Sequence, residues 1–339
     1  MGVLTVALCT STNQSRNTMK AAVHYSYGGP DVVSIADIPK PEPGNGEVLV
    51  RIRASSVNAA DWRLRRANPW MVRLLFGFFK PKNPILGVVF AGEVEAVGKD
   101  VTKYAKRDRL FGWTGFKKLS GHAEYIALPQ DGPFSLMPAN MDFTDAAAIP
   151  FGGGTALDFL NKAAIRKGQQ VLIYGASGAV GTAAVQLARQ MGAEVTGVCS
   201  TRNMELVRGL GATTVLDHTK DDLTAIHDRY DVVFETVGKL PFASCLRLLK
   251  PGGVLILGSE MPGATLLRAL KSKGGKNPRI IQGTAGQRAE DMHHLKTLIE
   301  RNELRAVIDT TYPLERIAEA HALAESGHKR GNVVITMDR

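Results

Sequence analysis

A glycine-rich heptapeptide, Gly175-Ala176-Ser177-Gly178-Ala179-Val180-Gly181, constrains the fold more than any other part of the sequence. It follows the apolar run 171–174 and opens a helical stripe formed by Val180, Ala183, Ala184, Leu187, Ala188 and Met191. Strand, glycine turn and helix in this order form a pyrophosphate-binding unit. Ala176 takes the place of the first glycine, Gly178 lets the backbone approach a pyrophosphate, and Gly181 allows close packing of the helix on the strand. Because a helix N-terminus attracts negative charge, we expect Ser177, Gly178, Ala179, Val180 and Gly181 to bind a dinucleotide.

Two strand patterns divide the chain. After Pro150, short apolar runs alternate with helical stretches, and strands that are apolar on both sides are typical of a parallel sheet covered on both faces. These runs are 171–174, 195–198, 214–216, 232–234 and 254–257. Before Phe143, β-branched runs are separated by Pro and Gly, and the apolar–charged alternation of 47–53 predicts a half-buried strand in a mostly antiparallel β domain.

We therefore predict an α/β protein. A mostly β domain covers residues 19–143, a doubly wound parallel sheet that binds the coenzyme covers 144–280, and a C-terminal return over 281–339 completes the first domain. Residues 1–18 carry no basic residue before their apolar stretch. We interpret them as an N-terminal extension rather than a secretory signal, with organelle targeting left open.

Charge and cysteine content bear on partners and compartment. The 42 basic and 32 acidic residues give a net charge of +10, which favours anionic partners. Basic residues are scattered apart from clusters at 63–82 and 268–279, so we expect a generally basic surface and no specific nucleic-acid groove. Three distant cysteines argue against a disulfide framework, and there is no apolar run of about eighteen residues. These features predict a soluble protein in a reducing compartment, such as the cytoplasm.

The end of the second strand of the parallel sheet discriminates between two coenzymes. A carboxylate about twenty positions after the glycine loop would bind the ribose 2′-hydroxyl of NAD. The sequence there reads Cys199-Ser200-Thr201-Arg202-Asn203 and has no acidic side chain. The hydroxyls of Ser200 and Thr201 and the guanidinium of Arg202 suit a 2′-phosphate, because Arg offers forked, charge-assisted donors. We predict NADPH over NADH, a role that is compatible with helix capping by Ser200 or Asn203.

From residue 19 to the end, several stretches together resemble the quinone oxidoreductase branch of the medium-chain dehydrogenase/reductase superfamily, which lacks zinc. Besides the glycine loop, they are Glu47–Val50, Ser56–Trp62, Phe90–Val94, Ala123–Tyr125, Gly153–Ala156, Tyr230–Gly238, Leu248–Gly253 and Arg330–Ile335. The resemblance implies a GroES-like catalytic domain, a Rossmann coenzyme domain and an active site in the cleft between them. It also implies that Thr155, Val237, Gly238, Leu257 and Gly258 lie near the nicotinamide, and that His218 lies near the adenosine. Asn332, in the last of these stretches, is a further coenzyme-binding candidate.

The sequence departs from the zinc-dependent members of this superfamily, which supply a Cys and a His-Glu pair as ligands. Asn58 stands near the Cys position, and the His-Glu site reads Gly87-Val88-Val89-Phe90. We therefore predict no metal site. Hydride transfer without a Lewis acid requires an acceptor that itself delocalises charge, such as a quinone or an α,β-unsaturated carbonyl.

Three residues are candidates for catalysis. Asn58 is the first, for orienting coenzyme or substrate, because its amide both donates and accepts. Asp61 and Arg65 follow, although a structural Asp61 paired with a neighbouring arginine is an equal alternative. Arg63 stands where simpler quinone reductases often carry Tyr, and the Asp61-Trp62-Arg63 pattern is more similar to the subgroup that reduces enones and alkenals.

Two apolar and basic segments, 69–80 and 266–271, have three open roles: ordinary core or dimer contact, a flap over a hydrophobic substrate, or a patch that touches anionic lipid. The second segment reads as a short amphipathic helix. The expected partner is a small hydrophobic quinone or conjugated carbonyl, and the expected assembly is a monomer or homodimer. Two other functions stay open: a non-catalytic NADPH-binding protein, crystallin-like or associated with nucleic acid, and an enoyl-thioester reductase.

Overall fold

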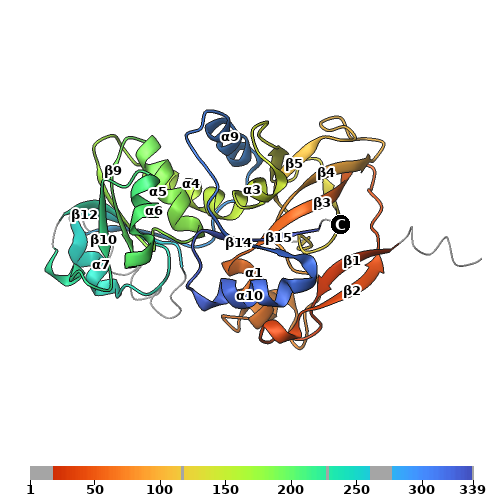
Figure 1. Ribbon diagram of the computed structural model, residues 1–339, viewed down its shortest axis with the longest axis horizontal. Helices are drawn as coiled ribbons and strands as arrows, with labels where there is room; N and C mark the ends of the chain where they lie inside the picture. The colour runs from red at the N-terminus through yellow and green to blue at the C-terminus, as the bar shows by residue number, and fades with distance from the viewer. Residues whose placement is uncertain (1–17, 116–117, 227–228, 260–276, 338–339) are drawn as a thin grey trace, which may run out of the picture.

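The computed structural model describes residues 18–115, 118–226, 229–259 and 277–337. Figure 1 shows two sheet-based halves, with the antiparallel strands at one end and the parallel strands at the other. Among the described residues, no helix is both long and apolar enough to cross a bilayer. The 266–271 segment lies outside the described residues.

The antiparallel half is built mainly on a seven-stranded sheet in the order β14-β15-β3-β4-β5-β7, with β6 paired to β3. Its strands are β3 (Glu47–Val57), β4 (Val89–Val97), β5 (Arg109–Trp113), β6 (Tyr125–Pro129), β7 (Phe134–Leu136), β14 (Ile308–Pro313) and β15 (Asn332–Thr336). The C-terminal return therefore enters this sheet, because β15 pairs antiparallel with β3. A separate hairpin pairs β1 (Thr18–Val23) with β2 (Ser34–Pro39).

The half-buried strand predicted at 47–53 is present over 50–53, where buried Val50 and Ile52 alternate with the more exposed Arg51 and Arg53, but the alternation does not extend to Val48 and Leu49. Val48, Leu49 and Val50 are all at most 5% exposed. β3 is an interior strand, because it pairs with β4 and with β6 over the same residues, and Leu49 is buried although it lies on the face opposite Val48 and Val50. Only the charged positions such as Arg51 reach solvent.

The parallel half is a six-stranded sheet in the order β10-β9-β8-β11-β12-β13, which confirms the doubly wound prediction. Its strands are β8 (Gln170–Tyr174), β9 (Glu194–Cys199), β10 (Thr214–Asp217), β11 (Tyr230–Glu235), β12 (Leu249–Leu257) and β13 (Arg279–Gln282). The α-helices of the described residues are α1 (Ala59–Arg66), α2 (Val72–Phe76), α3 (Phe143–Ala147), α4 (Pro150–Ala163), α5 (Ala179–Gln190), α6 (Met204–Gly209), α7 (Phe242–Leu248), α9 (Ala289–Glu300) and α10 (Ile317–Ser326).

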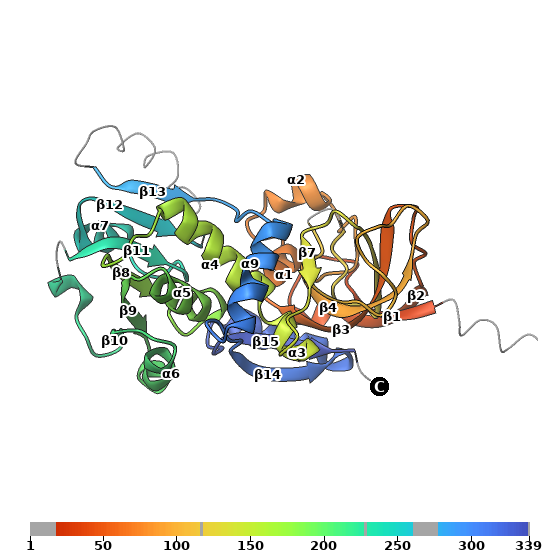
Figure 2. The ribbon, with the colours of Figure 1, turned by 90° about the horizontal axis from the view of Figure 1, so that it is seen from above.

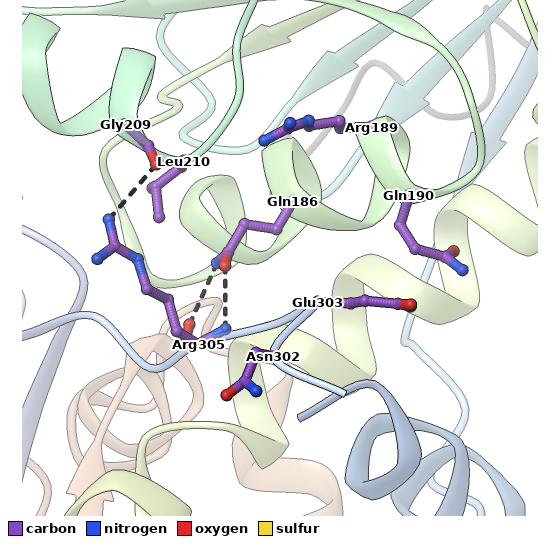
Figure 3. A pocket seen from close by; sticks show the side chains of 8 residues that line it. All are labelled: Gln186, Arg189, Gln190, Gly209, Leu210, Asn302, Glu303 and Arg305. Atoms are coloured by element: carbon purple, nitrogen blue, oxygen red, sulfur yellow. Dashed lines mark hydrogen bonds between the residues drawn. The ribbon is translucent and has the colours of Figure 1, made fainter. Parts of the chain in front are cut away.

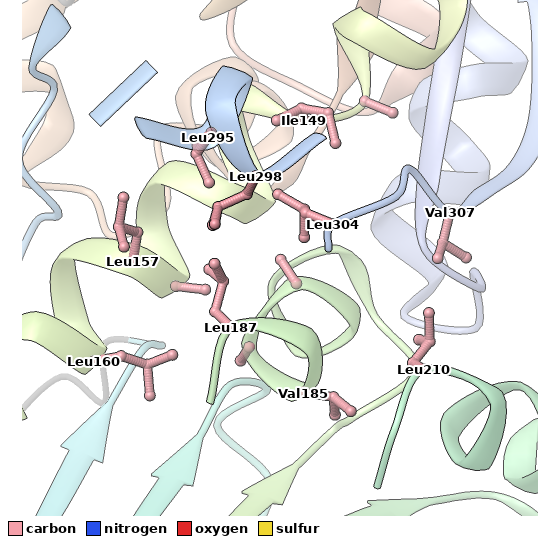
Figure 4. Packing of buried hydrophobic residues seen from close by; sticks show 14 of the residues in the cluster. Ile149, Leu157, Leu160, Val185, Leu187, Leu210, Leu295, Leu298, Leu304 and Val307 are labelled. Atoms are coloured by element: carbon pink, nitrogen blue, oxygen red, sulfur yellow. The ribbon is translucent and has the colours of Figure 1, made fainter. Parts of the chain in front are cut away.

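Alternate residues of the parallel strands pack on opposite faces. Ile173 and Phe234 belong to a buried cluster with α4, α5 and α9, whereas Leu172 and Val233 pack with α7. Figure 4 shows Leu187 of α5 among the apolar side chains of the first cluster. That cluster also includes Trp113 of β5, so the core is continuous from one half to the other. This continuity sets the two sheets side by side, with α9 between them in the view from above (Figure 2).

Candidate active site

The glycine loop joins β8 to α5 through backbone contacts that exclude side chains. Gly175 has φ +80°, and a Cβ at Gly181 would lie 2.1 Å from the Gly175 carbonyl oxygen. α5 therefore packs closely on β8, as the glycine at position 181 led us to expect. The left-handed residue of the turn is Gly175 rather than position 176, where buried Ala176 packs in the core.

The same loop has the form of an anion cradle. Gly178 is the N-cap residue of α5, and no side chain caps this helix. A Cβ built on Gly178 would meet only the Gly175 oxygen, at 3.5 Å, so the space beside the first turn of α5 is open. Uncapped amides and open space at the N-terminus of a three-turn helix fit the pyrophosphate of a dinucleotide.

The C-terminal part of the chain contacts this loop. The Gly331 amide donates to the Ser177 carbonyl oxygen at 2.7 Å, and Gly331 forms an isolated bridge with Gly178. The next residue, Asn332, is buried and donates its side-chain amide to the Val307 oxygen at 3.1 Å. Asn332 thus lies beside the loop, with its side chain directed to the backbone.

The predicted adenosine-side residues lie at the carboxyl ends of β9 and β10. Asn203 donates to the Ser177 hydroxyl at 3.0 Å and to the Ser200 hydroxyl at 3.3 Å, which ties this corner to the glycine loop. Arg202 is exposed and donates to the His328 carbonyl oxygen at 2.6 Å. His218 follows β10, and its ring centroid lies 6.2 Å from that of Tyr174.

Asp217, at the end of β10, is a carboxylate that sequence reasoning missed at this corner. Thr201 and Thr219 donate hydroxyl hydrogen bonds to it, and these bonds lower the pKa of Asp217 to about 2. Asp217 is only 3% exposed. Its negative charge is therefore buried and hydrogen-bonded within the protein, and the Thr201 hydroxyl proton is engaged by it.

Four of the five predicted nicotinamide-side residues, Val237, Gly238, Leu257 and Gly258, lie at the carboxyl ends of β11 and β12. Glu235 is buried, and its carboxylate accepts from the amides of Val237 and Gly238, which shapes the turn after β11. Burial raises the pKa of Glu235, and the backbone amides oppose this effect. Leu257 ends β12 and is buried, and the Gly258 amide donates to the Glu235 carbonyl oxygen at 2.8 Å. Thr155 is buried in α4.

Arg63 links the two halves at this edge. Its Nη2 donates to the Ser259 hydroxyl at 2.8 Å, although the two residues are 196 positions apart. Ser259 is 5% exposed, and a Cβ at Gly238 would lie 3.0 Å from its Oγ. The Arg63 guanidinium therefore stands where β11 and β12 end. Neither Arg63 nor Ser259 was a candidate from the sequence, because no local spacing relates them.

The three catalytic candidates lie on or beside α1 and are fully buried or nearly so. Asn58 caps α1 by accepting from the Ala60 amide at 3.0 Å. Asp61 accepts from the Asn58 amide at 2.9 Å and from the Gly87 amide at 3.1 Å. Arg65 pairs with Glu325. The alternative in which Asp61 pairs with a neighbouring arginine is thus wrong, since its partners are backbone amides.

Burial dominates the electrostatics of this group. Asp61 is 0% exposed, and burial raises its pKa to about 7 against the opposing effect of the amides. The signal for its local role was present in the sequence, since Asn58 and Asp61 have the three-residue spacing of a capping box. Among the described residues, no three His, Cys, Asp or Glu side chains are placed to hold a metal ion.

A groove of about 490 Å³ lies elsewhere in the parallel half (Figure 3). Gln186 bridges the Arg305 amide and carbonyl across it, and Arg305 also donates to the Gly209 oxygen. The groove lies along the C-terminal half of α5, and its lining residue nearest to the glycine loop, Gln186, is about 12 Å along the helix from Gly178. It is therefore separate from the candidate active site.

Comparisons with known proteins give one consistent family. The model of the alcohol dehydrogenase GroES-like domain matches residues 44–141, and that of the zinc-binding dehydrogenase family matches residues 210–335. A quinone oxidoreductase of Sus scrofa is 35% identical over 92% of this chain and 95% of its own length. The NADPH-dependent alkenal/one oxidoreductase of Arabidopsis thaliana is 29% identical over 94% of this chain and 79% of its own.

Solved structures agree with the sequence relatives. The quinone oxidoreductase from Coxiella burnetii superposes with a TM-score of 0.85 at 30% identity, over 95% of this chain and 100% of that one. The predicted architecture, a GroES-like domain with a Rossmann domain, is confirmed by the matched domain and the parallel sheet. The chain therefore belongs to the quinone oxidoreductase branch of the medium-chain dehydrogenase/reductase superfamily.

Proposed function

We propose that this chain is an NADPH-dependent, zinc-independent reductase of quinones or α,β-unsaturated carbonyls. Family membership makes it an oxidoreductase with a nicotinamide coenzyme. The observation that carries the proposed reduction of a conjugated acceptor is the Arg63–Ser259 contact, which brings a positive charge of the catalytic half to the carboxyl edge of the coenzyme sheet. That edge is where ligands of doubly wound folds bind.

The chain would hold the coenzyme through its own backbone and polar groups. The uncapped amides of α5 would bind the pyrophosphate, and Arg202 and Ser200 would bind a 2′-phosphate. We propose residues 144–280 as the coenzyme-binding domain. When bound, NADPH supplies a hydride. A conjugated acceptor receives negative charge on its oxygen as it is reduced, and the Arg63 guanidinium would stabilise that charge.

Asn58 and Asp61 would position α1 rather than touch the acceptor in this arrangement. Their mutual hydrogen bonds fix the start of the helix that carries Arg63. Zinc independence rests on the ligand positions: Gly87 has φ +103°, and its Cβ position would lie 2.4 Å from the His122 amide, so a coordinating side chain does not fit there without backbone movement. The proton that completes the reduction would come from solvent.

The test is a panel of a 1,4-quinone, an enone and an enoyl thioester, followed by loss of NADPH absorbance with NADH in parallel. We expect turnover of a quinone or enone, unaffected by a chelator, and a preference for NADPH that Arg202→Ala reduces. Arg208→Ala, which removes an exposed guanidinium from neighbouring α6, is the matched control. Equal use of NADH, reversible inhibition by a chelator, or turnover of the thioester alone would each contradict the corresponding part of the proposal.

A further inference from the structure

The segment 69–82, here called the α2 segment, exposes an unusual amount of apolar surface. Three pairs of apolar residues reach solvent: Trp70 (63% exposed) and Met71 (58%), Leu74 (60%) and Leu75 (76%), and Phe78 (56%) and Phe79 (88%). In the view from above, α2 stands at the outer edge of the molecule (Figure 2). Of the first alternative, ordinary core or dimer contact, the core interpretation is therefore wrong for these six residues. Contiguous exposed apolar patches mark interaction sites.

Contacts with neighbouring residues fix the orientation of this segment, with the apolar pairs on its solvent side. Tyr27 donates its hydroxyl to the Gly77 carbonyl oxygen at 2.7 Å, and the Arg73 guanidinium lies 4.9 Å from the Tyr27 ring centroid. Phe76 packs on the main core cluster. The inner side of α2 is thus already filled by Arg73 and Phe76. A flap over a substrate would require the exposed pairs to face inward, where these two side chains already lie.

The charged side chains within the sequence around the patch have one sign. Residues 62–92 include six basic side chains and no acidic one: Arg63, Arg65, Arg66, Arg73, Lys80 and Lys82. Arg65 and Arg66 both pair with Glu325. Lys80 and Lys82 are exposed directly after the Phe78–Phe79 pair, whose rings meet edge to face with centroids 5.0 Å apart. Exposed aromatic rings next to lysines are complementary to a surface with an apolar interior and an anionic outer layer.

We propose that the α2 segment docks on an anionic lipid bilayer. Phe78, Phe79 and Trp70 would enter the boundary between headgroups and acyl chains, and Lys80 and Lys82 would contact lipid phosphates and carboxylates. A second copy of the chain is a poorer occupant, because a two-fold contact would bring the same cationic segment against itself. This inference does not depend on the reductase proposal.

Flotation of the full chain with vesicles tests the proposal. The vesicles are phosphatidylcholine alone and phosphatidylcholine with about 30% phosphatidylserine. We expect binding to the anionic vesicles that weakens with salt. Phe78→Ser/Phe79→Ser and Lys80→Gln/Lys82→Gln should each reduce the bound fraction, the first by roughly tenfold or more. Matched controls are Val97→Ser/Leu136→Ser, two exposed apolar residues of β4 and β7, and Lys99→Gln/Lys106→Gln, two exposed lysines; both should bind as the parent does.

Several results would overturn the inference. One is a parent chain that does not float with the anionic vesicles at low salt. Another is a Phe78→Ser/Phe79→Ser variant that floats with them as well as the parent does. Self-association that this variant abolishes, without vesicle binding, would assign the patch to a second copy. Slower reduction of a soluble quinone by this variant, without vesicle binding, would assign it to a flap. A chain that floats but reduces no acceptor leaves this inference standing and removes only the proposed reaction.

Discussion

The buried Asp61 carboxylate offers a quantitative test of the site's electrostatics through Asp61→Asn. The side chain is 0% exposed and accepts from the amides of Asn58 and Gly87. Burial raises its pKa from 3.8 to about 7. Asparagine keeps the shape and removes the titration. The NH₂ group of the asparagine faces a backbone amide donor where the carboxyl group presents an acceptor. We therefore expect the free energy of unfolding to fall by about 1–3 kcal/mol at every pH.

The sign of the pH effect follows from proton binding. Between the two pKa values the folded protein holds one more proton at Asp61 than the unfolded chain. The free energy of unfolding of the parent protein therefore falls as pH rises, by about 1.4 kcal/mol per pH unit, until the pH passes 7. The stabilisation is fully present below the unfolded pKa. The variant lacks this contribution at every pH.

The assay is urea denaturation of both proteins between about pH 5 and pH 8, with the difference in unfolding free energy taken at each pH. Buried histidines such as His122 titrate in both proteins, so their contribution cancels in the difference. We expect the advantage of the parent over Asp61→Asn to be about 3 kcal/mol larger at pH 5 than at pH 8. A difference that stays constant would refute the reasoning, because it would mean that the amides keep Asp61 ionised throughout.

Three further changes probe the fold. Gly181→Ala places a Cβ 2.1 Å from the Gly175 oxygen, so we expect the free energy of unfolding to fall by about 1–3 kcal/mol and the coenzyme to bind more weakly. Denaturation and fluorescence titration measure the two effects, and a variant unchanged in both would contradict the packing described. Burial lowers the pKa of His122 to about 4, so stability is lost as pH falls from 6.5 to 4. His122→Gln should reduce the loss of unfolding free energy over this pH range by about 3 kcal/mol. The same dependence of unfolding free energy on acid pH in the variant and the parent would disprove this. Leu187→Ala, at 1% exposure in α5, should cost about 2–5 kcal/mol with an unchanged denaturant slope.

The parallel sheet was predictable from the sequence because a strand buried on both faces must be apolar throughout, and such runs stand out at β8, β9, β11 and β12. The edge strand β13 was not found. Its ends, Arg279 and Gln282, are exposed at the sheet margin, so only two apolar residues mark it. Short edge strands carry little periodicity.

The candidate site was predictable where its geometry is local. The glycine loop is a single strand-turn-helix unit, and its spacing is visible in one stretch of sequence. Arg63 and Ser259 meet only through the packing of two domains, which no spacing encodes. The role of the α2 segment stayed open for a related reason: the sequence shows its apolar residues, but the contact of Tyr27 with Gly77, 50 positions away, helps to decide which side faces solvent.

The position of β15 in the antiparallel sheet determines an order of events during synthesis. β15 completes the edge of β3 at Ala54–Val57, yet it is translated after every strand of the parallel sheet. The parallel sheet has all its described strands once residue 282 has left the ribosome, while this part of β3 still lacks its neighbour on the β15 side. An open strand edge is a template for association with other chains. The nascent protein is therefore exposed to misassembly at the Ala54–Val57 edge of β3, and a chain that stops before residue 332 retains that exposed edge permanently.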